Sequence, residues 1–207
     1  MDPGIILSFI GATVLFTLAP GPDNMYLTAK SLSVGARAGI ALALGLSLGP
    51  AFHTVLVMAG VSAFIKNSPE AFRLLTGLGI CYLLFLAWKA WRAKPQAQDF
   101  SEEGNDFSFF ALTRQGILMN VLNPKVLLFF MALLPQFVKL ESSLSPAWQI
   151  GILGIVFSIQ SFIVFSLLAL GASKIRGYLS SEKNFFAVMH KIEAVVLVVI
   201  ASGLFFL

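Results

Sequence analysis

The sequence predicts an all-α integral membrane protein in which six transmembrane helices form two inverted three-helix repeats. Its composition supports the class, because 57% of the residues are hydrophobic and 12% are charged, whereas soluble domains carry about 25% charged residues. One interrupted helix in each half supports the repeat. No positively charged start or small-residue cleavage site opens the chain, so we expect the first apolar segment to remain as a span.

Six apolar segments follow one another, and each is long enough for a span, which needs roughly 20 residues. The segments cover about 5–32, 38–65, 70–92, 112–138, 147–171 and 186–207. A polar stretch at 95–110 separates the third segment from the fourth and is expected to be a linker. We therefore predict one membrane domain, with a first repeat at 1–94 and a second at 111–207.

The positions of lysine and arginine predict the orientation. Ten of the 14 lie at the connections between segments one and two, three and four, and five and six: Lys30, Arg37, Lys89, Arg92, Lys94, Arg114, Lys174, Arg176, Lys183 and Lys191. The opposite connections carry Lys66, Arg73 and Lys139. The positive-inside rule then places the linker in the cytoplasm and both termini outside. With three spans per half, the two halves enter the membrane from opposite sides, as inverted repeats do.

A polar break interrupts the first segment at Pro20-Gly21-Pro22-Asp23-Asn24. Each proline removes a backbone N–H, and Gly21 lets the backbone bend, so the helix does not pass through intact. Backbone groups freed at membrane depth are tolerated only where they are buried in protein or line a wet cavity. Asp23 adds a carboxylate that costs roughly 2.5–3.5 kcal/mol at a helix centre. We interpret this break as part of a binding site.

The fourth segment carries a matching break at Asn123-Pro124-Lys125. Asparagine before proline is typical of an N-cap followed by the first helical position, so a new half-helix is predicted to begin there. Interrupted helices in corresponding places of two halves are the best sequence indication of a transporter's binding site.

Together the two breaks suit a zwitterion. Half-helix N-termini attract a carboxylate, while freed carbonyls and the Asp23 carboxylate suit an ammonium group. Lys125 can hold the carboxylate of the substrate or neutralise Asp23 when the site is empty. The competing interpretation is a structural Asp23–Lys125 ion pair that only stabilises two kinks. Ionisable residues inside a membrane favour the functional interpretation.

The motifs Pro20-Gly21-Pro22-Asp23 and Asn123-Pro124-Lys125 resemble the hallmarks of the LysE/RhtB family of amino-acid exporters, the lysine exporter and homoserine-threonine resistance type. The likeness covers essentially the whole chain, including Gly35, Gly39, Gly45 and Gly49, Gly79-Ile80-Cys81-Tyr82-Leu83 and Leu134-Pro135-Gln136-Phe137. The resemblance implies efflux of amino acids across the bacterial inner membrane, driven by the proton-motive force, by a protein that forms dimers. The chain departs from the family at Ala87, where a glycine is usual, and at Glu193, where a small residue is common.

Two further polar side chains lie deep in apolar segments. His53 shares a helix face with Gly45 and Gly49. It is either a proton relay or substrate contact, because imidazole titrates near neutral pH, or a side chain bonded to a neighbouring helix. Gln160 has the same alternatives, with bonding between helices favoured. The glycine pairs Gly35/Gly39 and Gly45/Gly49 are expected to be surfaces on which helices pack closely.

One motif suggests another class of protein. Gly45-Leu46-Ser47-Leu48-Gly49 fits the G-x-S-x-G pattern of serine hydrolases, but the pattern forms a nucleophile elbow only between a strand and a helix. Here it lies within an apolar helix, so an intramembrane serine hydrolase is a minor alternative. An inorganic ion transporter or channel that uses the same breaks is the other. We expect no cofactor, no metal and no nucleic-acid partner, because phosphate-binding, dinucleotide and metal-ligand motifs are missing from the sequence.

The leading hypothesis is a secondary active exporter of amino acids or small zwitterionic derivatives that is coupled to proton antiport and is not an enzyme. Asp23 is the expected protonation-coupled residue, which releases substrate when a proton arrives from outside. The expected partners are the amino acid, protons, the lipid bilayer and a second copy of the chain.

Overall fold

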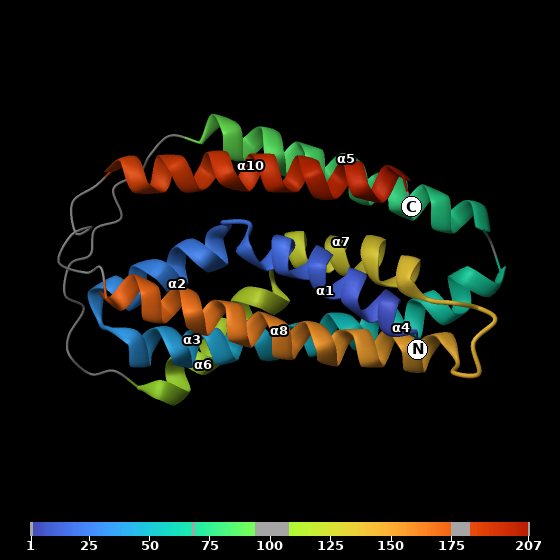
Figure 1. Ribbon diagram of the computed structural model, residues 1–207, viewed down its shortest axis with the longest axis horizontal. Helices are drawn as coiled ribbons and strands as arrows, with labels where there is room; N and C mark the ends of the chain where they lie inside the picture. Colours follow the sequence, from blue (N-terminus) through green and yellow to red (C-terminus); the bar gives the residue numbers. More distant parts are fainter. Residues whose placement is uncertain (1, 68, 94–107, 175–182, 207) are drawn as a thin grey trace.

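The computed structural model describes residues 2–67, 69–93, 108–174 and 183–206, and helices make up almost all of them (Figure 1). These helices are α1 (Pro3–Leu18), α2 (Pro22–Ser33), α3 (Ala36–Leu48), α4 (Pro50–Asn67), α5 (Pro69–Arg92), α6 (Phe109–Val121), α7 (Pro124–Leu133), the short 3₁₀ helix η1 (Leu134–Phe137), α8 (Pro146–Lys174) and α10 (Lys183–Phe206). The all-helical class is thereby confirmed. Most of the expected linker at 95–110 lies outside the described residues, and its last two residues begin α6.

Proline determines where many of these helices begin. α2, α4, α5, α7 and α8 each start at a proline. A proline fits the first helical position because its missing N–H has no partner there in any helix. The same ring removes a hydrogen bond from a preceding helix, and the chain bends at the two expected breaks. The bend is 63° between α1 and α2, and 57° between α6 and the helical stretch that starts at Pro124.

Among the described residues, three helices are long and apolar enough to cross a membrane, and the number rises to five if each bent pair forms one span. The three cover Ala36–Gly60, Pro146–Lys174 and Val188–Phe205. The remaining expected segment, 70–92, forms the 24-residue helix α5. That the chain has six spans, and that its two halves are inverted repeats, stay predictions.

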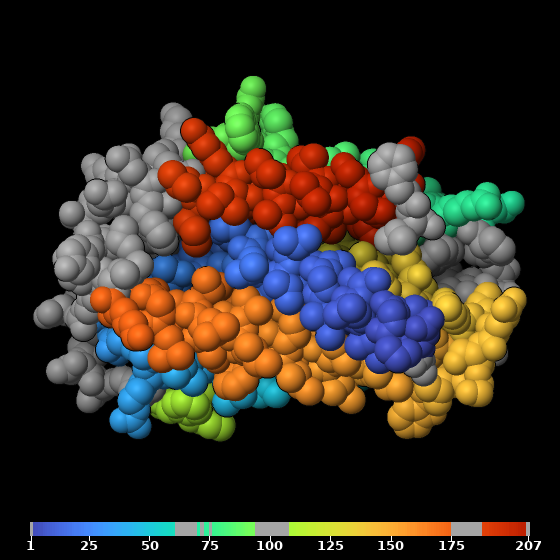
Figure 2. All heavy atoms as spheres, in the orientation of Figure 1, coloured from blue at the N-terminus to red at the C-terminus, as the bar shows by residue number. Residues whose placement is uncertain are grey.

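The helices pack in two groups (Figure 1). α5 and α10 lie side by side along one edge of the molecule and pack extensively against each other. α3, α6 and α8 pack together on the opposite side, and α1 and α7 lie between the groups, with α1 against α8 and α7 against α5. On the face shown in Figure 2, α1 lies between α8 and α10. One half of each bent pair, α1 in the first and α7 in the second, is therefore held in the middle of the bundle.

Aromatic rings fill the interior near α1 and α7. Phe16 stacks on Phe129 with ring centroids 3.6 Å apart, and Phe157 of α8 meets Phe130 edge to face at 4.8 Å. Apolar side chains also cover the outside. Ile155, Ile159, Ile163 and Leu167, spaced four residues apart on α8, are all exposed. Such a continuous apolar stripe is typical of a surface that faces lipid.

Glycines allow the close approach of α3 to its neighbours, as expected for three of the four. A Cβ on Gly39 would meet Ser31 and Ala169, one on Gly45 would meet Thr113 and Gly116, and one on Gly49 would meet Asn120. The expectation is wrong for Gly35, around which a Cβ would find open space. Gly35 instead has φ +115° at the turn between α2 and α3, a backbone conformation that glycine adopts without steric cost.

We expect Gly45→Ala to lower the stability of the folded protein by about 1–3 kcal/mol, because the added methyl overlaps the Thr113 carbonyl of α6 and cannot be accommodated by a rotamer change. The unfolding midpoint of the purified protein in detergent measures this loss. The matched control is Gly11→Ala, where a Cβ would have no neighbour within 4 Å. Equal stability of the two variants would contradict the close contact between α3 and α6.

Candidate functional site

The two helix breaks, a hundred residues apart in the chain, meet in the interior of the bundle. The Asn123 Nδ2 group donates a hydrogen bond to the Asp23 Oδ2 atom over 2.8 Å. Asp23 and Lys125 are buried, with 8% and 7% of their surfaces exposed. The two motifs occupy corresponding positions in the two halves of the sequence, and a direct contact joins them.

In the first break, Asn24 caps the end of the helix that precedes it. α1 ends at Leu18, and the Asn24 Nδ2 group donates to the carbonyls of Thr17, at 2.8 Å, and Ala19, at 3.2 Å. Gly21 is the N-cap of α2 in an extended conformation, and no side chain among the described residues caps the N–H groups of this helix. Asp23 lies in the first turn of α2, as expected. The negative end of α1 and the positive end of α2 thus lie next to each other.

The second break has the predicted N-cap. The Asn123 Oδ1 atom accepts a hydrogen bond from the Lys125 backbone N–H at 3.0 Å, and Pro124 occupies the first helical position of α7. The same asparagine therefore uses its oxygen to start α7 and its amide nitrogen to hold Asp23. An amide side chain can do both because its oxygen accepts and its nitrogen donates a hydrogen bond. Asn123 therefore caps α7 and also links the second break to the first.

The Asp23–Lys125 ion pair of the competing interpretation is not among the contacts of the described residues. Within the part of the chain that the structure describes, the Lys125 ammonium pairs with Glu193 of α10, with Nζ and Oε1 3.6 Å apart. It also donates to the Ala19 carbonyl at 3.3 Å and lies 5.2 Å from the centre of the Phe16 ring. The physical reason is that Asn123 already holds Asp23, while α10 brings another carboxylate to the lysine.

Glu193 thereby joins the site; the sequence marked it as a departure from the family pattern that could alter gating or substrate choice. Its other oxygen, Oε2, lies 3.7 Å from the His190 Nδ1 atom one turn earlier on α10. The carboxylate has 9% of its side-chain surface exposed, so it is placed in the interior by the packing of α10. The signal in the sequence that could have identified Glu193 as a site residue is its acidic side chain in the middle of an apolar segment.

A small cavity lies between the two breaks. Five of the predicted site residues line it: Gly21, Asp23, Asn24, Asn123 and Lys125. The other lining residues are Phe16, Thr17, Ala19, Asn120, Val126, Phe157 and Phe165. The space open to the centre of a water-sized sphere is about 30 Å³, and one water needs roughly 10–15 Å³ by that measure. The cavity holds a few waters at most, so an amino acid requires the surrounding groups to move.

His53 and Gln160 do not line this cavity, but each contacts a residue that does. The His53 Nε2 atom is 3.1 Å from the Asn120 carbonyl, and the ring is completely buried. The Gln160 Nε2 group donates to the Thr17 hydroxyl at 3.3 Å. Both make the contacts between helices that were the alternative to a direct role. Pro20, Pro22 and Pro124 contribute through the backbone bends.

The serine of the hydrolase-like motif is engaged within its own helix. The Ser47 hydroxyl is buried and donates to the Ala43 carbonyl at 2.8 Å. Its motif lies in helical structure, as expected, at the end of α3, and residues 2–44 contain no strand. The arrangement differs from the exposed strand-to-helix turn of a nucleophile elbow.

Thr17 and the aromatic lining were missed by sequence reasoning. Thr17 is a single hydroxyl in an apolar helix, and its role depends on Asn24 and Gln160 reaching it. Phe16, Phe157 and Phe165 are three of 20 phenylalanines, so no local pattern distinguishes them. Only the packing of α1 against α8 brings these rings to the cavity.

Comparison with known proteins supplies a family context. The family model of LysE type translocators matches residues 14–206. An uncharacterized membrane protein of Vibrio cholerae is 34% identical over 173 residues, which cover 83% of each chain. The leucine efflux protein of Klebsiella pneumoniae is 27% identical over 86% of this chain and 84% of its own. That of Salmonella typhimurium is 26% identical over 86% and 83%. No solved structure matches the chain.

We expect Asn123→Ala to destabilise the protein more than the loss of an ordinary N-cap, which costs about 0.5–2 kcal/mol. The variant removes the cap of α7 and also the hydrogen bond that the buried Asp23 receives. Ser108→Ala is the matched control, because Ser108 caps α6 at an exposed position with no second partner of this kind. Thermal unfolding in detergent compares the two, and equal losses would contradict the link between the breaks.

Proposed function

This chain belongs to the family of LysE type translocators, and from that membership we propose that it is a secondary exporter of amino acids or small zwitterionic derivatives. The observation that carries the proposal is the meeting of the two breaks around a cavity lined by both Asp23 and Lys125. Relatives described as leucine efflux proteins support the same substrate class. The description of the family as translocators is also consistent with the expectation that the chain is not an enzyme.

The site offers separate groups to the two ends of a zwitterion. The N–H groups at the start of α2 have no side-chain cap, and a helix N-terminus favours a carboxylate. Lys125 lies in the same cavity and adds a positive charge. Asp23 and the carbonyl end of α1 provide negative potential for an ammonium group. Both kinds of group lie within one buried space, as recognition of a small amino acid requires.

The aromatic lining favours an apolar side chain. Phe16, Val126, Phe157 and Phe165 line the cavity together with the residues of the breaks. Burial of an aliphatic side chain against such groups contributes about 1.5–3 kcal/mol, whereas a charged side chain would lose its hydration there. We therefore favour neutral apolar amino acids of the leucine type as substrates.

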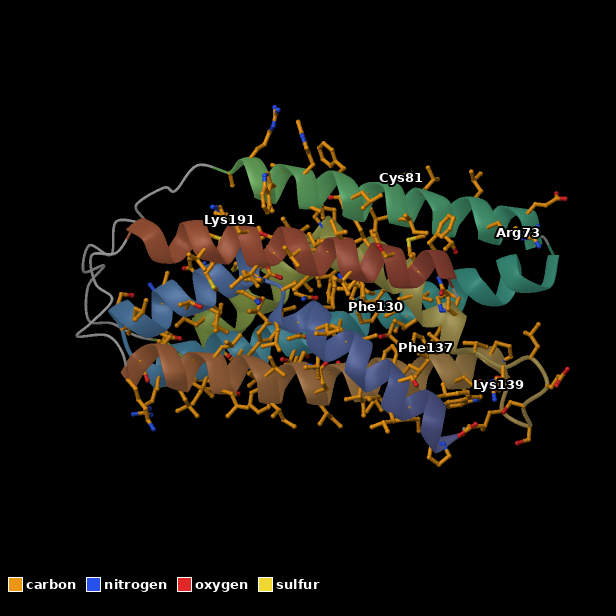
Figure 3. The ribbon with its side chains drawn as sticks, turned by 45° about the horizontal axis from the view of Figure 1, so that its top comes forward. Arg73, Cys81, Phe130, Phe137, Lys139 and Lys191 are labelled. Atoms are coloured by element: carbon orange, nitrogen blue, oxygen red, sulfur yellow. The ribbon has the colours of Figure 1, made fainter. Side chains whose placement is uncertain are left out.

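The proposed setting is the bacterial inner membrane, with six spans, an inverted pair of repeats and both termini outside. Arg73 and Lys139, expected on the outer side, lie toward one end of the molecule, and Lys191, expected on the cytoplasmic side, lies toward the other (Figure 3). This arrangement supports the separation of the two charge groups across the membrane. A homodimer is part of the proposal.

Proton antiport is proposed to act through Asp23. In its ionised form the carboxylate attracts the ammonium of the substrate, and a proton arriving from outside removes that attraction. The protonated carboxyl can still accept the hydrogen bond from Asn123, so the link between the breaks survives the change of charge. Inward release of the proton then restores the site for the next substrate.

We expect proteoliposomes containing the purified protein to lose internal leucine faster when the outside is more acidic than the inside. The gradient drives protons inward in exchange for the amino acid. A protonophore should abolish this acceleration, and protein-free liposomes control for leak. Flux of inorganic ions without any amino-acid flux would contradict the proposal and favour the ion-transporter alternative.

We expect Asp23→Asn to lower proton-dependent leucine efflux by about tenfold or more. The asparagine amide cannot take up and release the coupled proton as a buried carboxylate does. Initial rates with and without the pH gradient measure the effect. Glu141→Gln, a change of an exposed carboxylate, is the control and should transport normally. Unchanged gradient dependence in Asp23→Asn would remove this residue from the coupling mechanism.

A further inference from the structure

The Lys125 ammonium occupies a site with the chemistry of a cation receptor. The Ala19 carbonyl accepts its hydrogen bond at 3.3 Å, the Glu193 carboxylate lies at 3.6 Å, and the Phe16 ring centre lies at 5.2 Å. We call these three groups the cation seat. Gly21 leaves room for the ammonium, because a Cβ at that position would lie 3.0 Å from Nζ.

Each group of the cation seat recognises a primary ammonium in general and not lysine in particular. The Ala19 carbonyl belongs to the C-terminal end of α1, where the helix dipole is negative. A carboxylate supplies the opposite charge, and an aromatic face attracts a cation through its quadrupole. The α-ammonium of an amino acid has the same charge and the same three donors as the lysine head group.

The lysine head group also takes space that a substrate needs. Phe16, Ala19, Gly21 and Lys125 all line the cavity, which is too small for an amino acid while Lys125 points into the seat. Departure of a cation without replacement would leave the Glu193 carboxylate buried with an unpaired charge, which is costly. An exchange of one ammonium for another avoids that cost because the charge of the buried site does not change.

We propose that the ammonium group of the substrate binds in the cation seat in exchange for the Lys125 head group, which thereby becomes free to meet the carboxylate of the substrate. This inference rests on the proposed function and adds Glu193 and Phe16 to the groups that recognise the substrate. Lys125 then has two successive partners. Its ammonium occupies the cation seat when the carrier is empty, and it binds the carboxylate of the substrate when the carrier is loaded.

Rescue by an external amine tests whether the seat accepts a free ammonium. The full-length Lys125→Ala variant is purified in detergent and titrated with propylammonium chloride at constant ionic strength. We expect a saturable rise of roughly 2–4 °C in its melting temperature, as for a ligand that binds only the folded state. Propanol, which has a similar shape and no charge, should give no rise. Absence of any amine-dependent rise in folded Lys125→Ala would overturn the proposal.

Two control variants locate the effect. Lys139→Ala removes a lysine whose ion pair with Asp2 is on the surface, with side chains 62% and 55% exposed, and should not respond to propylammonium. The double variant Lys125→Ala/Glu193→Gln loses the carboxylate of the seat and should lose the response. A full response in the double variant would place the amine elsewhere and overturn the seat.

Competition with leucinamide tests whether the substrate ammonium uses the same seat, because leucinamide keeps the ammonium and the side chain of leucine and has no carboxylate for Lys125 to bind. We expect leucinamide to raise the half-saturating concentration of propylammonium in Lys125→Ala about threefold or more. An amine response that leucinamide leaves unchanged would overturn the exchange and leave the exporter function standing. Failure of the wild-type protein to transport any amino acid would instead overturn the proposed function, whatever the amine result.

A transport measurement applies if Lys125→Ala does not fold. In proteoliposomes, Glu193→Gln should raise the KM for leucine about tenfold with little change in kcat, because the charge of the seat acts in binding. Glu193→Asp keeps the charge and should recover part of the affinity. An unchanged KM in Glu193→Gln would overturn the role of the seat in recognition.

Discussion

Backbone groups released inside a membrane must find partners within the protein, and the arrangement of this molecule follows from that constraint. The end of α1 is satisfied by Asn24 and the start of α7 by Asn123. Because Asn123 also holds Asp23, the two discontinuities are placed against each other and not against lipid. Their common position inside the bundle creates a setting in which several polar groups can gather at low cost.

The same constraint determines which groups surround the buried charges. A buried lysine needs an acceptor or a negative charge on several sides, and Lys125 obtains these from the end of α1 and from α10. The helix that supplies Glu193, α10, therefore belongs to neither interrupted segment. A site built in this way responds to the relative positions of three parts of the chain, which is suitable for a carrier whose groups must separate and rejoin.

Local chemistry made part of this structure predictable. The half-helix starting at Pro124, with Asn123 as its cap, and the bend at Pro22 follow from the two or three residues involved. The Lys125–Glu193 pair could not be predicted in this way, because it depends on how α10 is placed beside α1. Gly35 was assigned to a packing surface by its spacing, whereas its φ of +115° shows a turn. The cavity and its aromatic lining likewise depend on packing between distant segments.

The pairing of α5 with α10 has a mechanical consequence. α10 makes its most extensive contacts with α5 and few with α1, while α5 also packs against α7. Glu193 lies on α10, whereas Ala19 and Lys125 lie on the bent helices. Any movement of α10 relative to α1 and α7 would therefore change the distance between the Glu193 carboxylate and the Lys125 ammonium in the interior.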